Sequence, residues 1–223
     1  MKRIIAPLLF GLIGAAILVS LGTWQMQRLE WKRGILSKIE STISGDPIAL
    51  PQLISPSEQE YMPVRLTGQI GDQALFVLVS AKRVGAGWRV ISPMTTVEGR
   101  RILLDRGFTP VENKTAPPRA EQITLLGNLH WPDDRNSSTP ENDVAKNTWF
   151  ARDIAQMAEL LDTEPLLVIA REIAPPDPGL TLLPVDTAGI PNDHLQYAIT
   201  WFSLAVVWLL MTGALIWRRS KED

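Results

Sequence analysis

Two long uncharged stretches, one near each end of the chain, constrain the fold more than any other feature of the sequence. They cover residues 4–27 and 195–217, and neither contains Asp, Glu, Lys or Arg. Each is longer than the roughly 20 residues that a helix needs to cross the hydrocarbon core of a bilayer. Aromatic residues lie near both limits of the second stretch, as in an interfacial belt. The sequence therefore predicts two transmembrane helices, at residues 4–27 and 194–217.

A cleaved signal peptide is the alternative for the first stretch, because the chain starts with the basic segment Met-Lys-Arg. The apolar stretch exceeds the roughly 7–15 residues of a signal peptide, and no clear cleavage site follows it, which favours an uncleaved anchor. Lys2 and Arg3 precede the first helix, and Arg218, Arg219 and Lys221 follow the second. The positive-inside rule then predicts two cytoplasmic termini, with residues 218–223 as a cytoplasmic tail. An Arg- and Ser-rich presequence is missing, which favours the inner membrane of a bacterium and a periplasmic loop.

Residues 28–193 are expected to form one extramembrane domain, large enough to have its own core. Leucines and isoleucines at helical spacing continue the first helix until Gly45-Asp46-Pro47 ends it. Asp153 can cap a short helix that runs to Leu161. Short runs rich in Val, Ile, Leu, Thr and aromatic residues predict strands at 61–70, 74–81, 88–95, 101–108, 122–130 and 166–173. Most of the breaks between them are short and contain glycine, so the domain is expected to be mostly antiparallel β (α+β). Such strands can also close into a barrel.

The composition and the motifs argue against several classes of function. The chain has no cysteine, which removes disulfides, thiolate zinc sites and cysteine nucleophiles. The net charge of −2 argues against a nucleic-acid partner. The two histidines, His130 and His194, stand in no HExxH motif, and the chain has no GxSxG. We therefore expect that the protein is not an enzyme. The alternative is a hydrolase tethered to the membrane, in which a Ser or Asp acts with His130. Asp133-Asp134 beside a proline is more typical of a turn than of a cation site.

His194 is the most distinctive candidate for chemistry, because it stands where the second predicted helix begins. Tyr197, Trp201, Ala205 and Trp208 follow it at spacings of three or four, which indicates one face of a helix. A neutral imidazole above a strip of flat side chains could bind haem iron. The alternative is an interfacial histidine above a stripe of helix-packing residues.

A matching cluster lies where the first predicted helix leaves the membrane. It consists of Trp24, Gln25, Arg28, Trp31 and Lys32, which fall on roughly one side of the helix. If the two helices pack together, Arg28 or Lys32 could meet an acidic group such as a haem propionate. The alternative is a membrane anchor, with basic head groups that reach lipid phosphates and tryptophans at the interface.

Five short segments, spread from Leu21 to Phe202, together form a recognisable pattern. They are residues 21–32 (LGTWQMQRLEWK), 63–68 (PVRLTG), 103–110 (LLDRGFTP), 147–153 (NTWFARD) and 192–202 (NDHLQYAITWF). In this order they resemble the Surfeit-locus family of cytochrome c oxidase assembly proteins. Asp105 and Phe108 depart from that family's Asn-Arg-Gly-Trp-x-Pro segment. We expect these two departures to alter only a detail of the domain surface.

The resemblance implies a bacterial assembly factor that binds haem a between its two helices and assists its insertion into oxidase subunit I. His194 occupies the position of the family's proposed ligand to the haem iron. With it, the expected haem-binding residues are Tyr197, Trp201, Trp24, Gln25 and Arg28. The expected partners are subunit I, the machinery that synthesises and delivers haem a, and the lipid bilayer. A scaffold that binds oxidase subunits through its periplasmic domain, without haem, is the alternative.

Overall fold

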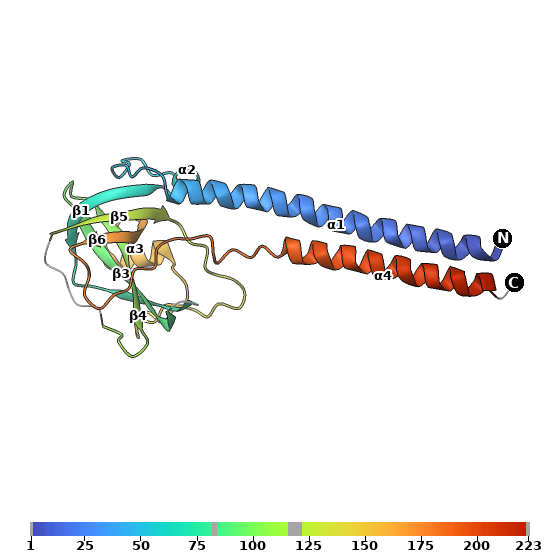
Figure 1. Ribbon diagram of the computed structural model, residues 1–223. Helices are drawn as coiled ribbons and strands as arrows, with labels where there is room; N and C mark the ends of the chain where they lie inside the picture. The colour runs from blue at the N-terminus through green and yellow to red at the C-terminus, as the bar shows by residue number, and fades with distance from the viewer. Residues whose placement is uncertain (1, 82–83, 116–121, 222–223) are drawn as a thin grey trace. The chain divides into compact units, whose positions relative to one another are not determined.

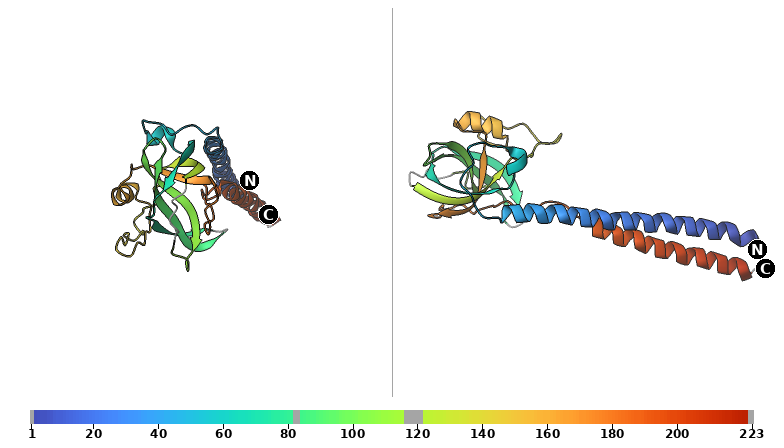
Figure 2. Two further views of the ribbon diagram at one scale, coloured as in Figure 1. Left: turned by 90° about the vertical axis from the view of Figure 1, so that its left-hand side faces the viewer. Right: turned by 90° about the horizontal axis from the view of Figure 1, so that it is seen from above.

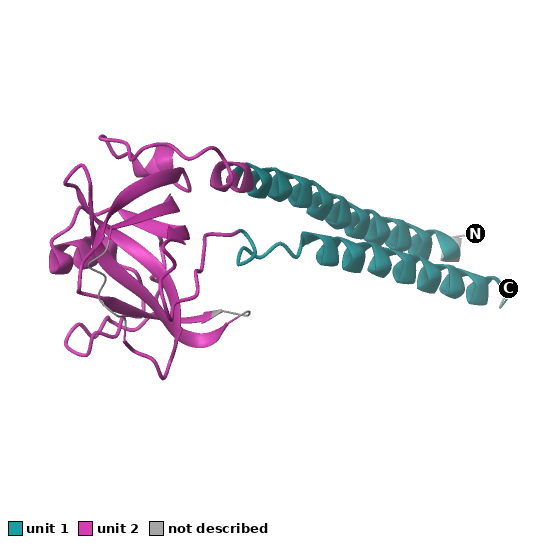
Figure 3. Ribbon diagram, turned by 60° about the vertical axis from the view of Figure 1, so that its left-hand side comes forward, with its two compact units in different colours: residues 1–38, 187–223 teal, residues 39–186 magenta. Residues whose placement is uncertain are grey.

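The computed structural model describes residues 2–81, 84–115 and 122–221. The chain forms two compact units, which Figure 3 shows in different colours. The helical unit contains Met1–Lys38 together with Thr187–Asp223, and the β unit contains Ile39–Asp186. The predicted membrane boundaries at 27/28 and 193/194 do not coincide with these divisions at 38/39 and 186/187. For the first boundary, α1 continues as a helix beyond the apolar stretch. Those membrane boundaries stay predictions.

Two long helices carry the apolar stretches of the sequence. Helix α1 spans Lys2–Ile43 and α4 spans His194–Lys221. Both are long and apolar enough to cross a membrane. α1 ends two residues before Gly45, as the sequence predicts. Within the helical unit they run side by side in opposite directions (Figure 1 and Figure 2). The prediction of two apolar helices near the ends of the chain is therefore confirmed.

Small residues bring α1 and α4 into close contact. The buried small residues on the facing sides are Gly11, Ala15, Gly22, Ala198 and Ala205. The Trp208 indole donates a hydrogen bond from Nε1 to the carbonyl oxygen of Gly11 at 3.0 Å. A Cβ atom at Gly14 would lie 2.4 Å from Trp208, and one at Gly22 would lie 2.6 Å from Phe202. Glycine is therefore what allows these bulky rings to pack against the backbone of the opposite helix.

Six strands form one sheet in the order β1-β5-β6-β4-β3-β2, and β1 also pairs with β3. The strands are β1 Pro63–Ile70, β2 Leu75–Ala81, β3 Gly85–Thr96, β4 Arg101–Pro110, β5 Gln122–His130 and β6 Leu167–Ala174. The β1–β3 pairing closes all strands except β2 into a ring. Only β4 and β6 pair in parallel; the other pairings of the described strands are antiparallel. The mostly antiparallel, barrel-like domain is therefore confirmed.

One predicted break between strands belongs to a strand instead. Residues 85–87 pair with β2, with Gly85 opposite Ala81. Gly85 has a φ of +83°, which a glycine adopts without steric cost. Gly85 therefore allows β3 to begin three residues earlier than its β-branched residues indicate.

Apolar side chains fill the inside of the ring and cover part of its outside. The interior cluster takes alternate residues of the strands, among them Leu66, Ile102, Leu104, Leu125 and Val168. Leu103 points the other way, into a second cluster with Trp149, Met157 and Leu161. The last two belong to α3, which spans Ile154–Leu161 and is capped by Asp153 as predicted. A short helix, α2, spans Pro56–Gln59 ahead of β1.

The chain that returns from β6 is attached to β4 by a buried ion pair. Arg106 donates from Nε to Asp177 Oδ2 at 2.7 Å and from Nη2 to Oδ1 at 3.0 Å. The backbones of Phe108 and Thr181 exchange two hydrogen bonds, at 2.7 and 2.9 Å. A Cβ atom at Gly107, where φ is +113°, would lie 2.4 Å from the Thr181 carbonyl oxygen. The Arg-Gly-Phe part of the third family segment thus holds this return segment in place.

The expectation that Asp105 and Phe108 alter only the domain surface is wrong. Asp105 is fully buried and Phe108 is 4% exposed. The Asp105 carboxylate accepts hydrogen bonds from Arg89 Nη1 at 2.5 Å and from the backbone N–H of Gly107 at 3.0 Å. The return segment covers this part of β4. The sequence of the strand alone does not indicate this cover. Both departures are therefore accommodated inside the fold.

Candidate functional site

His194 and Gln25 meet in the helical unit. His194 is the first residue of α4, and its Nδ1 lies 2.8 Å from Oε1 of the buried Gln25 on α1. With the amide oxygen as the acceptor, Nδ1 carries the proton and Nε2 keeps a lone pair. Metal-binding histidines commonly have this arrangement, in which a second residue fixes the tautomer and the ring orientation. The pair can therefore present Nε2 as a ligand for a metal.

The aromatic residues of α4 divide between two sides of the helix. Trp201 and Trp208 are half-buried and share with Ala198 and Ala205 the side that faces α1. Tyr197 is 56% exposed. It stands three residues after His194, which rotates it about 60° away from the histidine on an α-helix. The structure thus brings Trp201 onto the side of His194 but leaves Tyr197 at its edge.

Of the predicted cluster on α1, Gln25 is the residue that reaches His194. Trp24 is 53% exposed, and Trp31 is also exposed. The Arg28 guanidinium lies 4.0 Å from the centre of the Trp31 ring, in a cation–π contact. Trp24, Arg28 and Trp31 are thus exposed, whereas Gln25 is buried. Their predicted role toward a haem propionate stays a prediction.

His130 belongs to a different cluster, in the β unit. Its Nδ1 lies 2.5 Å from Glu60 Oε1, and its ring stacks on Tyr61 at 5.5 Å between centroids. Within the described part of the chain, His130 has no Ser or Asp as a hydrogen-bond partner. Burial, together with the charge of Glu60, raises the pKa of Tyr61 above its ordinary value of 10.0. The structure offers no support for a hydrolase built on His130.

Asp134 lies in an irregular segment and not in the turn that the sequence favours, and it forms an ion pair. Arg152 donates from Nε to Asp134 Oδ2 at 2.6 Å and from Nη2 to Oδ1 at 2.9 Å. Among the described residues, no group of three His, Cys, Asp or Glu could hold a metal ion. Burial alone would raise the pKa of Asp134, but the hydrogen bonds and charge of Arg152 outweigh it, so the pKa lies below the ordinary value of 3.8.

This ion pair predicts a loss of stability in acid. A carboxyl whose pKa is lowered in the folded state stabilises that state above its unfolded pKa, and the contribution is lost as the pH falls through the folded pKa. We expect Asp134→Asn to cost about 1.5–3 kcal/mol of unfolding free energy at pH 7. The cost should shrink as the pH falls below 3.8. Thermal unfolding of the full-length protein in detergent between pH 3 and 7 measures both effects.

The neighbouring residue provides the control for this experiment. Asp133 is exposed and carries the same charge. Asp133→Asn should change the unfolding free energy by less than about 0.5 kcal/mol, as is usual for surface substitutions. Equal effects of the two substitutions at pH 7 would contradict the role assigned to the Asp134–Arg152 pair.

Sequence comparison with known proteins identifies the family of this chain. A sequence model of the SURF1 family matches residues 12–206, which include both Gln25 and His194. Surfeit locus protein 1 of Gallus gallus is 31% identical over 209 residues, covering 82% of this chain and 67% of that protein. A SURF1-like protein of Rickettsia felis is 30% identical over 219 residues, with 94% and 95% covered. Human Surfeit locus protein 1 is 29% identical over 210 residues, with 83% and 69% covered. The chain therefore belongs to the SURF1 family, as its five sequence segments predict.

Proposed function

We propose that this protein is an assembly factor of cytochrome c oxidase that binds haem a transiently at His194 and assists its insertion into subunit I. Membership of the SURF1 family supports the assembly role. The hydrogen bond between His194 and Gln25 is the observation that carries the haem assignment, because it leaves Nε2 as a ligand. The protein acts without catalysis of its own, and receives haem a from the machinery that makes it.

The proposed location is the bacterial inner membrane, with both termini in the cytoplasm and the β unit in the periplasm. The two apolar helices support a membrane location. The basic residues in the last turn of α4, Arg218, Arg219 and Lys221, support the orientation. In this arrangement His194 lies near the periplasmic surface, at the start of α4. It is there that haem would meet a subunit of the oxidase.

The packing of the helices restricts where the haem can lie. From Gly11 to Gly22, rings of α4 contact the backbone of α1, so a macrocycle does not fit between the helices along this part. The haem would lie beside His194, where Trp201 and Tyr197 offer flat apolar faces and Trp24 and Arg28 are exposed. Its farnesyl tail would remain in the bilayer. A single histidine ligand is consistent with release of the cargo.

The haem content of purified variants tests this proposal. The full-length protein is produced in cells that make haem a, purified in detergent, and its absorption spectrum is recorded. We expect the wild type to carry haem a and His194→Ala to lose most of it. Gln25→Leu should weaken binding by roughly 10–100-fold, because the imidazole loses the group that fixes its tautomer. His130→Gln removes the other histidine and should leave the haem content unchanged.

The outcome also separates the haem-independent scaffold from the haem carrier. If folded His194→Ala keeps its haem, the assignment of the ligand to His194 is overturned. If the wild type carries no haem a and His194→Ala supports normal oxidase yield, a scaffold that binds oxidase subunits replaces the haem carrier. Changes at Arg106, Gly107 or Phe108 do not probe the scaffold, because these residues are buried or held against Thr181. Exposed apolar residues of the β unit, such as Leu53 and Val97, are the sites at which to test it.

A further inference from the structure

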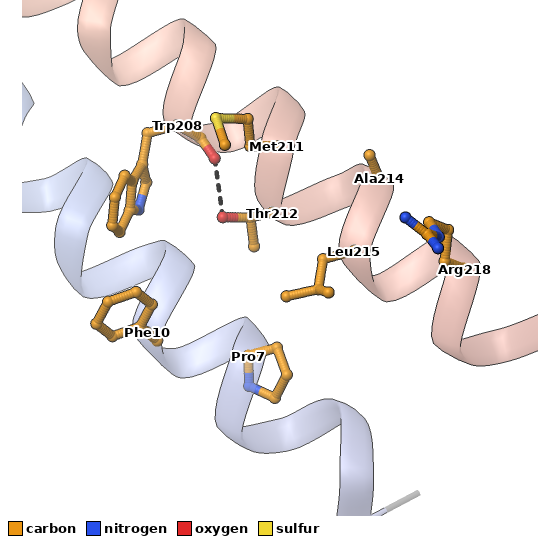
Figure 4. Close-up of a pocket in the computed structure, with 8 residues that line it drawn as sticks. All are labelled: Pro7, Phe10, Trp208, Met211, Thr212, Ala214, Leu215 and Arg218. Atoms are coloured by element: carbon orange, nitrogen blue, oxygen red, sulfur yellow. Dashed lines mark hydrogen bonds between the residues drawn. The ribbon is translucent and has the colours of Figure 1, made fainter.

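An apolar groove opens on the helical unit close to the ends of the chain (Figure 4). Its volume is about 430 Å³, within the range of roughly 300–1,000 Å³ that is common for ligand sites. It is lined by Pro7, Phe10, Trp208, Met211, Thr212, Ala214, Leu215 and Arg218. Trp208, the α4 residue of the lining that comes first after His194, stands 14 residues after it, which corresponds to about 21 Å. The groove is therefore separate from the proposed haem site.

The polar side-chain atoms of Trp208 and Thr212 in the wall of the groove form hydrogen bonds within the protein. Trp208 donates its indole N–H to Gly11, and the Thr212 hydroxyl donates to the carbonyl oxygen of Trp208 at 2.8 Å. Phe10 packs against Trp208 with 5.2 Å between ring centroids. The wall thus presents mainly apolar surface to an occupant, which favours a hydrocarbon chain.

Positive charge marks one end of the groove. In Figure 4, Arg218 lies at one end of the lining residues and Trp208 and Phe10 lie toward the other. Among the lining residues that the structure describes, Arg218 alone is charged. A ligand with an apolar chain and an anionic head group matches this distribution. Basic residues beside transmembrane helices on the cytoplasmic side bind anionic lipid head groups in this way.

We propose that this groove binds one anionic phospholipid of the cytoplasmic leaflet. An acyl chain lies along Phe10, Met211 and Leu215, and the Arg218 guanidinium binds the phosphate. The proposal rests on the membrane topology given above, in which the end of α4 that carries Arg218 faces the cytoplasm. It does not depend on haem binding.

Lipid retention by the haem-free protein tests the proposal. The full-length protein is made in cells that lack haem a and is exchanged into nanodiscs that contain equal amounts of phosphatidylglycerol and phosphatidylcholine. After extraction into mild detergent, native mass spectrometry counts the lipids that stay bound. We expect one phosphatidylglycerol per chain in preference to phosphatidylcholine. Arg218→Gln should lower the retention of phosphatidylglycerol about fivefold, and Leu215→Trp should lower it further by filling the groove.

Two matched variants separate the groove from general effects of charge and bulk. Arg219→Gln removes the same charge one residue along, where the helix has turned by about 100°. Leu210→Trp adds the same bulk at a residue that is 68% exposed and lies outside the groove lining. Both should retain phosphatidylglycerol as the wild type does. Equal retention of the two lipids, or equal losses in the variants and their controls, would overturn the proposal.

A parallel measurement of haem content distinguishes this site from the one at His194. Leu215→Trp made in cells with haem a should keep its haem, and His194→Ala should keep its phospholipid. If Leu215→Trp loses haem but not phospholipid, the groove holds the haem tail and the lipid assignment is wrong. If the wild type bound no haem, the lipid assay would still test the lipid proposal.

Discussion

Replacing Arg106 with methionine is expected to cost about 3–5 kcal/mol of the free energy of unfolding of the β unit. Arg106 is 1% exposed and makes a two-pronged ion pair with Asp177, whose side chain is 2% exposed. The substitution removes the guanidinium and leaves the Asp177 carboxylate buried without that compensating charge. Such a cost is a large fraction of the roughly 5–15 kcal/mol by which most domains are stable.

Chemical denaturation of the full-length protein in detergent measures this effect. Arg106→Met together with Asp177→Leu should recover most of the loss, because an apolar pair of similar volume carries no unpaired charge. Arg101→Met is the matched control on the same strand. The Arg101 side chain is 44% exposed, so its loss should cost no more than about 1 kcal/mol. Similar costs for Arg106→Met and Arg101→Met would contradict the role assigned to the buried ion pair.

Gly68→Val is expected to open the ring of strands between β1 and β3. A Cβ atom at Gly68 would lie 2.2 Å from the carbonyl oxygen of Thr95 and 2.8 Å from Cα of Thr96. Both are backbone atoms, so a change of rotamer cannot relieve the overlap and the strands must separate. We expect a cost of about 3 kcal/mol, at the upper end of the range for overpacking.

Hydrogen exchange of the β1 and β3 amides measures the opening directly. Exchange should become faster in Gly68→Val at the paired residues 68–70 and 94–96. Gly34→Ala is the control, because no atom lies within 4 Å of a Cβ at Gly34 and alanine favours a helix. Unchanged protection of both strands in Gly68→Val would show that the ring is not held closed at this glycine.

The local elements of the fold could be predicted from the sequence because their signals are local. The run of Ile, Thr and Leu residues at 122–130 predicts β5 with the bounds that the structure gives. Asp153 predicts the start of α3 through a capping bond between its side chain and the backbone N–H of Gln156. In both cases the residues that determine the element lie within it or next to it.

The partners of these elements could not be predicted, because no local signal links them. Asp177 lies 71 residues after Arg106, and Glu60 lies 70 residues before His130. The pairing of β6 with both β4 and β5 likewise joins segments that are far apart in the chain. The sequence of β4 alone does not indicate that other segments cover both of its faces.

The candidate site was predicted in part. Matching depths on two helices bring His194 and Gln25 to the same region, and the structure joins them with a hydrogen bond. The sequence did not predict on which side of their helices Tyr197, Trp24 and Arg28 lie. Apolar residues surround these helices on all sides, so hydrophobic periodicity does not mark the contact face. The small residues Gly11, Gly22 and Ala205 mark it instead.

The position of β6 has a consequence for the order in which the protein folds during synthesis. β6 fills the space between β4 and β5, although it is the last of these strands to be made. A nascent chain that ends before Leu167 has two strands with unpaired edges, which can pair with other chains. The ring can therefore close only when synthesis has passed Ala174, shortly before the second apolar helix emerges from the ribosome. Until then the unfinished domain depends on protection from aggregation.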